Sequence, residues 1–392
     1  IYRFTKPNYL MFDSLIEFIR ELYGTSGQIP LHEPRFIGRE KELLSSTIDS
    51  SYVSSAGPSI QEFEEKIAEY TGSKYAIATV NGTSGLHVAL LALGVEKDTE
   101  VITQSLTFVA TSNAIKYCEA KPVFLDVDRE TLGLSHHSLA KFLKNNCEVR
   151  DDGFCWNKVS NKKVSACLPM HTFGFPVKIN KIKEICKSYN LKIIEDAAES
   201  LGSFYKGTHT GRTGELSCLS FNGNKIITTG GGGIVLTASK GLARKVRELT
   251  TTARKADVLY FRHSQVAFNY RMPNINAALG IAQMESLETF LLAKKELATK
   301  YRQFGEENNL CFFNQPKHSD SNFWLNTIIT KNLKERNLLL KSTNKAGINT
   351  RPLWTPMHLL SMNKDCTKDE MLNTEWLFKR IVNVPSSVII SR

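Results

Sequence analysis

The sequence lacks the features that would place it in a membrane-spanning or metal-binding class. Its 392 residues contain no apolar run of the roughly 18 residues that a membrane-spanning helix needs. The start, Ile1 to Lys6, lacks the basic-then-apolar order of a signal peptide, and the absence of a first methionine suggests that a few residues precede it. The eight cysteines form no C-x-x-C pair, so we expect buried thiols of a cytoplasmic protein and no metal site.

A glycine-rich dinucleotide fingerprint and a nucleic-acid-binding patch are also missing. The glycines at 230–233 do not fit G-x-G-x-x-G, because position 235 is valine, and we expect them to make a tight turn into a strand. The formal net charge is +11, but the densest basic patches, 161–163 and 331–336, are short and have no interleaved aromatic residues. We therefore expect a solvated basic surface and no nucleic-acid partner, with attraction for a pyrophosphate group as a second possibility.

From residue 75 onward the chain alternates between strand-like and helix-like segments. Its length is sufficient for one large core and a smaller second domain. Apolar strand-like runs lie at 75–80, 101–103, 122–127, 164–169, 191–194, 217–221 and 233–236. Because these runs are apolar without alternation, they predict an α/β fold with a mostly parallel, seven-stranded sheet covered on both faces. Ligands bind such sheets in the crevice beyond the carboxyl ends of the strands.

The hydrophobic spacing also suggests how the chain is divided. Apolar residues at helical intervals predict amphipathic helices at 12–22 and 60–70, and longer helices across 277–300. We expect an N-terminal extension with helices at 1–50, a large ligand-binding domain at 51–275 and a smaller C-terminal α/β domain at 276–392.

Two polar clusters directly follow predicted strands. Asp196 and Glu199 come after the run 191–194, where a carboxylate projects into the ligand crevice. An Asp there could pair with the protonated pyridine nitrogen of pyridoxal phosphate (PLP), although a helix N-cap is the more common role. Lys225 lies in the loop after the run 217–221 and could form an imine with the aldehyde of the same cofactor, although most lysines are solvated surface residues.

Candidates for binding a phosphate and stacking on a ring occur in the same part of the chain. The turn Gly82–Gly85 opens a helix, and the amide groups and dipole at that end favour a phosphate. Ser220 could add a hydrogen bond to this phosphate, yet many strand-to-helix turns bind nothing. Phe108 begins the next crossover helix and could stack on a pyridine face, while a core position is the ordinary role of a phenylalanine.

The order of these clusters is more specific than any one of them. A phosphate turn, a stacking aromatic residue, an Asp and then a Ser and a Lys resemble the layout of fold-type I PLP-dependent transferases. More narrowly, the chain is similar to the DegT/DnrJ/EryC1/StrS family of nucleotide-sugar aminotransferases over about residues 12–392. The motifs that carry this resemblance lie at 29–38, 78–83, 195–202, 219–230 and 268–273. The segment Phe221–Lys225 and the N-terminal extension look most like the branch that aminates C4 of a UDP-linked 4-keto-6-deoxy-N-acetylhexosamine, as in legionaminic-acid pathways.

The resemblance implies a cofactor, PLP, and a role for each residue that would bind it. Lys225 would be the Schiff-base lysine and proton shuttle, and Asp196 the partner of the pyridinium nitrogen. Glu199 would approach the 3-hydroxyl of the cofactor, where many relatives have Gln, and Phe108 would stack on the ring. The phosphate would be held by Thr83, Ser84 and Ser220.

The resemblance also implies a homodimer and a substrate side of the pocket. Asn269 would reach the cofactor phosphate of the neighbouring subunit, so that each active site is shared. His171, at the end of its strand, would line the pocket. Arg351 and His358 would lie near the substrate entrance.

The expected activity is amino transfer from L-glutamate to the C4 keto group of the UDP-linked sugar for surface-glycan biosynthesis, in two half-reactions. Amination at C3 is an alternative that the motifs do not exclude. Sugar dehydratases of this fold carry His at the Schiff-base position, so Lys225 argues against them. A PLP-binding regulator or a non-catalytic sugar-binding protein remains a third alternative, which the presence of both Lys225 and Asp196 disfavours.

Overall fold

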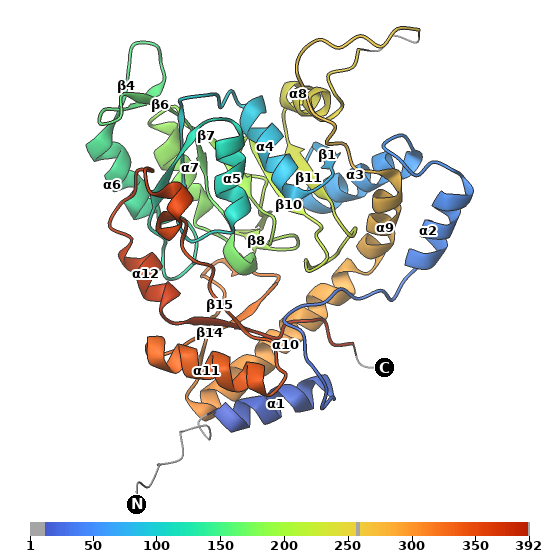
Figure 1. The fold of residues 1–392 in the computed structure, drawn as a ribbon, viewed down its shortest axis with the longest axis vertical. Coiled ribbons are helices and arrows are strands. Elements are labelled where there is room, and N and C mark those ends of the chain that lie inside the picture. Colours follow the sequence, from blue (N-terminus) through green and yellow to red (C-terminus); the bar gives the residue numbers. More distant parts are fainter. Residues whose placement is uncertain (1–11, 256–258, 391–392) are drawn as a thin grey trace, which may run out of the picture.

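The central sheet of the large domain contains the strands that the sequence predicts. The computed structural model describes residues 12–255 and 259–390, so the segment Ile1 to Lys6 lies outside the described residues. In spatial order the seven strands are β1 (Tyr75–Thr79), β11 (Gly233–Thr237), β10 (Leu216–Ser220), β7 (Lys192–Asp196), β6 (Lys162–Leu168), β2 (Glu100–Gln104) and β3 (Lys121–Leu125) (Figure 1). Both pairings of β11 are antiparallel, and the other four pairings are parallel. The predicted mostly parallel, seven-stranded sheet is therefore confirmed.

Helices cover both faces of this sheet because its strands are apolar on both sides. Adjacent residues of β7 enter different cores: Ile194 packs on one face beneath α4, α5 and α8, and Ile193 packs on the other beneath α6 and α7. The same second face is covered further along by α3, which packs against β1, and by α9, which packs against α3. These helices are α3 (Pro58–Thr71), α4 (Gly82–Ala92), α5 (Val109–Tyr117), α6 (His136–Asn146), α7 (Ile179–Lys187), α8 (Lys240–Thr250) and α9 (Asn274–Glu285).

Small strands and single turns complete the large domain. A hairpin extends the sheet beyond β6, and a separate three-stranded sheet lies near the domain boundary. The hairpin consists of β4 (Cys147–Val149) and β5 (Cys155–Asn157), and the small sheet of β8 (Phe204–Tyr205), β9 (Thr208–His209) and β13 (Ser319–Asp320). The 3-10 turns are η2 (Thr172–Gly174), η3 (Met357–Leu359) and η4 (Ser361–Asn363).

The smaller domain is built on an antiparallel sheet below the large one in Figure 1. Its strands, in spatial order, are β12 (Cys311–Phe312), β14 (Asn326–Ile329), β16 (Ile381–Val384) and β15 (Arg351–Pro352). The long helix α10 (Leu287–Asn308) runs from the large domain into this one, and α11 (Leu333–Lys345) and α12 (Leu372–Phe378) complete it. Within the described residues, we find no helix that combines the length and apolar character needed to cross a bilayer.

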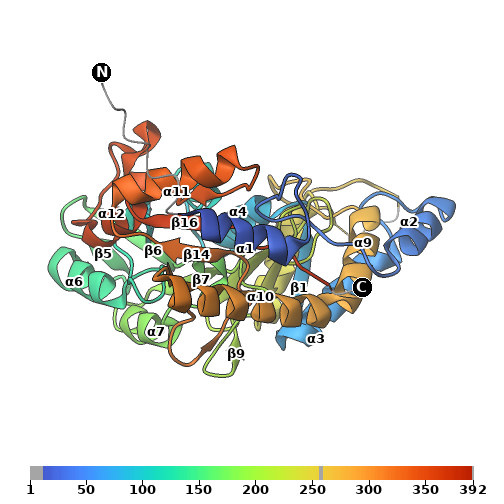
Figure 2. The same ribbon diagram turned by 90° about the horizontal axis from the view of Figure 1, so that it is seen from below.

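The expected N-terminal extension is divided between the two domains. Helix α1 (Asp13–Tyr23) buries Leu15 and Ile19 against α10 and β14, so it belongs to the core of the smaller domain (Figures 1 and 2). Helix α2 (Glu40–Asp49) lies against α9, where Gln283 donates a hydrogen bond of 2.7 Å to Glu40. Within residues 12–50, α1 and α2 therefore pack on different parts of the structure, and the domain boundaries at residues 50 and 275 stay predictions.

The helical segment expected at 277–300 is interrupted. Helix α9 ends at Glu285 and α10 begins at Leu287, with Ser286 between them. The two helices agree with the helices that the apolar spacing predicts across this range, and only the position of the break is new.

Candidate active site

A cavity of about 360 Å³ lies where β7 and β10 end, beside the N-terminus of α4. Lys225, Asp196, Glu199 and Ser220 all line it, together with the first residues of α4. These side chains come from three separate strand ends, and the parallel order of the sheet brings them to one edge.

Lys225 and Glu199 form an ion pair inside this cavity. The Nζ atom of Lys225 lies 3.2 Å from Oε1 of Glu199, and the lysine side chain is 14% exposed. The other carboxyl oxygen, Oε2, accepts a hydrogen bond of 2.9 Å from the N–H of Phe173. Burial raises the pKa of Glu199 to about 7, although the charge of Lys225 acts in the opposite direction. This pair can therefore hold or release a proton near neutral pH.

Asp196 is the last residue of β7, and its carboxyl group is buried at the wall of the cavity. Its Oδ2 atom accepts a hydrogen bond of 2.7 Å from the hydroxyl of Thr111, and Oδ1 accepts one of 3.2 Å from the N–H of Ala198. Burial raises the pKa of Asp196, and the hydrogen bond from Thr111 partly offsets this effect. A cation brought into the cavity would stabilise this carboxylate.

The N-terminus of α4 forms another wall of the cavity. Asn81 caps the helix, since its Oδ1 accepts the N–H of Ser84 at 2.8 Å. The backbone approaches β10 closely here: a Cβ atom added to Gly82 would lie 2.9 Å from Cβ of Ser220. Amides in the first turn of a helix lack partners within the helix, so Gly82 and Thr83 present donors beside the Ser220 hydroxyl. An anion the size of a phosphate would be stabilised there.

These features fit PLP. The cofactor needs an acceptor for its protonated ring nitrogen, donors for its phosphate and an amine for its aldehyde, and the cavity supplies Asp196, the α4 terminus and Lys225. Phe108, which is 49% exposed, also lines the cavity, with its ring centroid 5.9 Å from that of Trp354. Ser84 does not line it, because its backbone N–H is engaged by the cap and its side chain is buried.

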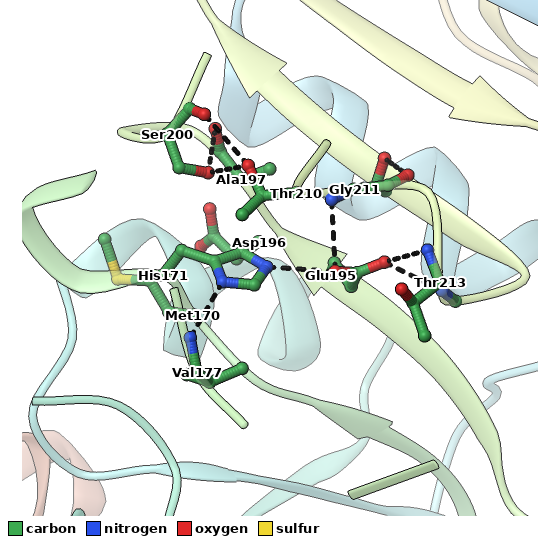
Figure 3. A network of polar contacts seen from close by, with 12 residues as sticks. Met170, His171, Val177, Glu195, Asp196, Ala197, Ser200, Thr210, Gly211 and Thr213 are labelled. Carbon is green, nitrogen blue, oxygen red and sulfur yellow. Dashed lines mark hydrogen bonds and ion pairs between the residues drawn. The ribbon is translucent and has the colours of Figure 1, made fainter. Parts of the chain in front are cut away.

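His171 does not line the cavity, so this prediction is wrong. Its ring is buried on the opposite side of the chain, where Nε2 lies 2.9 Å from Oε2 of Glu195 (Figure 3). Its Nδ1 accepts the N–H of Val177 at 3.2 Å, so Nε2 carries the proton and donates it to Glu195. Neighbouring side chains of extended chain point to opposite sides, and Met170 takes the place in the cavity instead.

Glu195 is the centre of this separate polar network. Its carboxyl oxygens also accept backbone N–H groups from Thr213 and Gly214, both at 2.7 Å (Figure 3). Burial alone would raise the pKa of Glu195, but the hydrogen bonds from His171 and from the backbone outweigh it and lower the pKa. The network fixes the loop after β9 against β7, directly behind Asp196.

The other predicted residues lie outside the main cavity. His358 is buried, with Nδ1 2.7 Å from the Ser105 hydroxyl, and its place near the substrate entrance stays a prediction. Arg351 lines a second cavity of about 400 Å³, which shares Asn224, Trp324 and Trp354 with the first. Asn269 is exposed and lines neither cavity, and its backbone pairs with that of Thr251. Within the described residues, no group of three or more His, Cys, Asp or Glu side chains could hold a metal ion.

Sequence reasoning missed three residues that shape the cavity. Asn81 could have been found, because Asn before an apolar helical run is a strong N-cap signal. Trp324 and Trp354 come from the smaller domain, and no local pattern around them indicates that they reach the large one.

Comparison with known proteins agrees with this geometry. Residues 35–392 match the model of the DegT/DnrJ/EryC1/StrS aminotransferase family. The chain belongs to this family. It is a PLP-dependent sugar aminotransferase with the fold-type I architecture.

Two relatives and one solved structure illustrate the similarity. GDP-perosamine synthase of Escherichia coli O157:H7 is 37% identical over 359 residues, which cover 91% of this chain and 93% of that protein. The putative PLP-dependent aminotransferase EpsN of Bacillus subtilis (strain 168) is 35% identical over 364 residues, covering 92% and 91%. A family member from Brucella abortus superposes with a TM-score of 0.80 at 25% identity, over 89% of this chain and 90% of that one.

Proposed function

We propose that the protein transfers the amino group of L-glutamate to the C4 keto group of a nucleotide-linked 4-keto-6-deoxyhexose. The observation that carries this proposal is the meeting of Lys225 and the buried Asp196 in one cavity of a sugar aminotransferase. Amino transfer needs both groups, because one must hold the cofactor and move protons while the other keeps its ring nitrogen protonated.

PLP, when bound, would supply an electron sink for the carbon that loses or gains a proton. Residues of the chain would bind the cofactor, orient it and move the protons. Lys225 would hold the cofactor and later carry the proton to and from the reacting carbon of glutamate or of the sugar. Asp196, oriented by Thr111, would hold the proton on the ring nitrogen. Thr83 and Ser220 would bind the phosphate, and Phe108 would cover the ring.

The nucleotide part of the substrate would extend toward the second cavity. Arg351 lines that cavity, and its guanidinium contacts neutral groups, the side-chain oxygen of Asn344 at 3.1 Å and the carbonyl of Thr350 at 2.9 Å. A cation that is not neutralised by these contacts is suited to a diphosphate. Trp324 and Trp354 separate the two cavities and offer flat apolar surfaces to a sugar ring.

We take GDP as the first nucleotide to test. Three relatives named GDP-perosamine synthase are 37%, 33% and 35% identical, and perosamine carries its amino group at C4. The UDP-linked 4-keto-6-deoxy-N-acetylhexosamine is the second candidate, because the segment Phe221–Lys225 resembles the branch that uses it. In either case the product would serve surface-glycan biosynthesis. The enzyme would be a cytoplasmic homodimer in which Asn269 of each subunit acts in the active site of the other.

The first experiment tests the attachment of PLP. The purified protein is incubated with PLP, reduced with borohydride and mapped by mass spectrometry. We expect PLP on Lys225, its loss in Lys225→Ala, and its retention in the control Lys240→Ala, which changes an exposed lysine of α8. A wild-type protein that binds PLP at no lysine would favour a non-catalytic binding role.

The second experiment tests the substrate. The protein is incubated with glutamate and either GDP-4-keto-6-deoxymannose or UDP-4-keto-6-deoxy-N-acetylglucosamine, and NMR locates the new amine. We expect amination at C4 of the GDP-linked sugar and parallel double-reciprocal plots. Product from the UDP-linked sugar alone would select the second candidate. A protein that aminates neither 4-keto sugar but does aminate a 3-keto sugar, added as a third substrate, would contradict the proposed position.

A further inference from the structure

Trp324 contacts Lys225 directly, although it belongs to the smaller domain. The Nζ atom of Lys225 lies 4.0 Å from the centroid of the indole ring, within the range of a cation–π interaction. The indole N–H donates a hydrogen bond of 2.7 Å to the carbonyl oxygen of Asn224. Trp324 is only 4% exposed, so water screens neither contact strongly. One side chain therefore holds both the amine and the backbone just before it.

The residues next to Trp324 hold the other member of the ion pair. The side-chain amide of Asn322 donates hydrogen bonds to the carbonyl oxygens of Glu199 at 2.9 Å and Leu201 at 2.8 Å. Its Oδ1 atom accepts the N–H of Trp324 at 2.9 Å. The segment Asn322–Trp324 thus fixes the backbone of Glu199 and the side chain of Lys225 at the same time.

A buried lysine anchors this segment from behind. Lys294 of α10 is completely buried, and its Nζ donates to the carbonyl oxygen of Trp324 at 2.8 Å and to that of Ser386. Burial holds the pKa of Lys294 well below its usual range. The contact gives the tryptophan backbone a fixed position relative to the helix that joins the domains.

We propose that Trp324 is a positioning residue for Lys225, which holds the ε-ammonium beside Glu199 with its indole face and fixes the preceding carbonyl with its N–H. This inference rests on the role proposed above for Lys225. A cation–π contact stabilises an ammonium and not a neutral amine, so Trp324 restrains Lys225 until the cofactor arrives. The charged or titratable groups that face Lys225 are Glu199, Asp196 and His32.

Trp354 provides a matched control within the same cavity. Its ring lies 4.9 Å from that of Phe173 and 5.9 Å from that of Phe108. Like Trp324 it lines both cavities, so truncating either side chain admits water to the same space. An effect that depends on the contact with Lys225 will appear only with Trp324.

The test measures the reactivity of Lys225 in the cofactor-free protein. The protein is treated briefly with a limiting amine-acylating reagent near neutral pH, and mass spectrometry compares Lys225 with the exposed Lys240 as internal standard. Because acylation requires the neutral amine, we expect Trp324→Leu to react roughly fivefold faster at Lys225. Trp324→Phe keeps an aromatic face and should stay within about twofold of wild type. Trp354→Leu should leave the Lys225 rate unchanged.

The second contact, between the indole N–H of Trp324 and the carbonyl oxygen of Asn224, is tested by measuring turnover. Trp324→Phe lacks the N–H that binds the Asn224 carbonyl, so its kcat should fall roughly fivefold with little change in KM for glutamate. Thermal unfolding checks that each variant is folded. If Lys225 is acylated no faster in Trp324→Leu than in Trp354→Leu, the proposed cation–π contribution is wrong. If Trp324→Phe keeps the wild-type kcat, the proposed contribution of the indole N–H is wrong. The acylation test needs neither cofactor nor sugar, and the attachment of PLP to Lys225 is tested separately by mass spectrometry. Failure of the proposed reaction can therefore be distinguished from failure of this inference.

Discussion

The Nζ atom of Lys225 and Oε1 of Glu199 lie 3.2 Å apart in a part of the cavity where the carboxyl group is almost completely buried. Two effects oppose each other here. Burial disfavours the carboxylate and raises the pKa of Glu199 to about 7, while the nearby ammonium favours the carboxylate. Burial is the larger effect. A glutamine at this position would keep the hydrogen-bonding shape of the side chain but could not release a proton.

Replacing Glu199 by Gln should make the stability of the protein less dependent on pH. The ordinary pKa of a glutamate is 4.5, and in the folded protein Glu199 titrates at about 7. Below the lower value both states are protonated and Glu199 has no effect. As the pH rises to the higher value, the unfolded state releases a proton that the folded state keeps, so folding loses up to about 3 kcal/mol. The difference in unfolding free energy, Glu199→Gln minus wild type, should therefore increase from about pH 5 to about pH 8. Urea unfolding of the cofactor-free proteins measures it, and a difference that stays constant would contradict the raised pKa.

Thr111 should matter for PLP binding through its contact with Asp196. The hydroxyl of Thr111 donates a hydrogen bond of 2.7 Å to Oδ2 of Asp196, and its oxygen lies 2.6 Å from the oxygen of the Thr107 hydroxyl. Thr111→Val keeps the shape and removes this donor, which leaves a buried carboxyl oxygen poorly satisfied. Hydrogen bonds to charged groups contribute about 1.5–3 kcal/mol, so PLP affinity should fall at least about tenfold. Fluorescence titration of the cofactor-free protein measures this affinity, and Thr111→Ser should restore most of it. Equal affinities for Val and wild type would show that Asp196 does not depend on this hydroxyl.

The predicted residues that line the cavity are those whose position follows from local structure. Asp196 ends a strand and Lys225 follows another, and parallel strands place both at one sheet edge. His171 follows β6 by three residues, and its side chain points away from the cavity. A shift of one residue reverses the direction of a side chain in extended chain, and the apolar run did not fix that register.

The residues that the sequence did not reveal come from outside the local strand–turn–helix units. Trp324 reaches Lys225 from the other domain, and its position depends on the buried Lys294 and on the course of α10. The division of residues 12–50 between two domains is similar, because α1 and α2 have ordinary amphipathic patterns that do not specify their partners. Contacts between domains depend on tertiary packing, which periodicity does not encode.

His171→Phe should reduce stability more than catalysis. The substitution removes the Nε2–H that donates to the buried Glu195 and the Nδ1 that accepts from Val177. Glu195 keeps its backbone donors, so we expect a loss of about 2 kcal/mol in unfolding free energy. Because the ring does not line the cavity, kcat at a temperature well below unfolding should stay within about threefold of wild type. Urea unfolding and initial rates check the two parts. A large loss of kcat with an unchanged free energy of unfolding would instead indicate that His171 acts on the substrate.

Asn269 offers a test of whether active sites are shared between subunits. The residue is exposed and does not line the cavity of its own chain, as expected if it serves a partner. Asn269→Asp would place a carboxylate beside the partner's cofactor phosphate, and Lys225→Ala would remove the lysine. If both act as proposed, a mixed dimer of the two inactive variants contains one intact site. Co-expression with random pairing should then restore roughly a quarter of wild-type activity.

The matched control is Gln265→Glu, which adds the same charge at another exposed position of the segment before Asn269 and should stay active by itself. Size-exclusion chromatography with light scattering establishes that the mixture contains dimers. If Asn269 instead acted within its own chain, every site in the mixture would carry one of the two defects, and activity would not recover. The amount of recovered activity thus separates a shared site from a self-contained one without knowledge of the sugar.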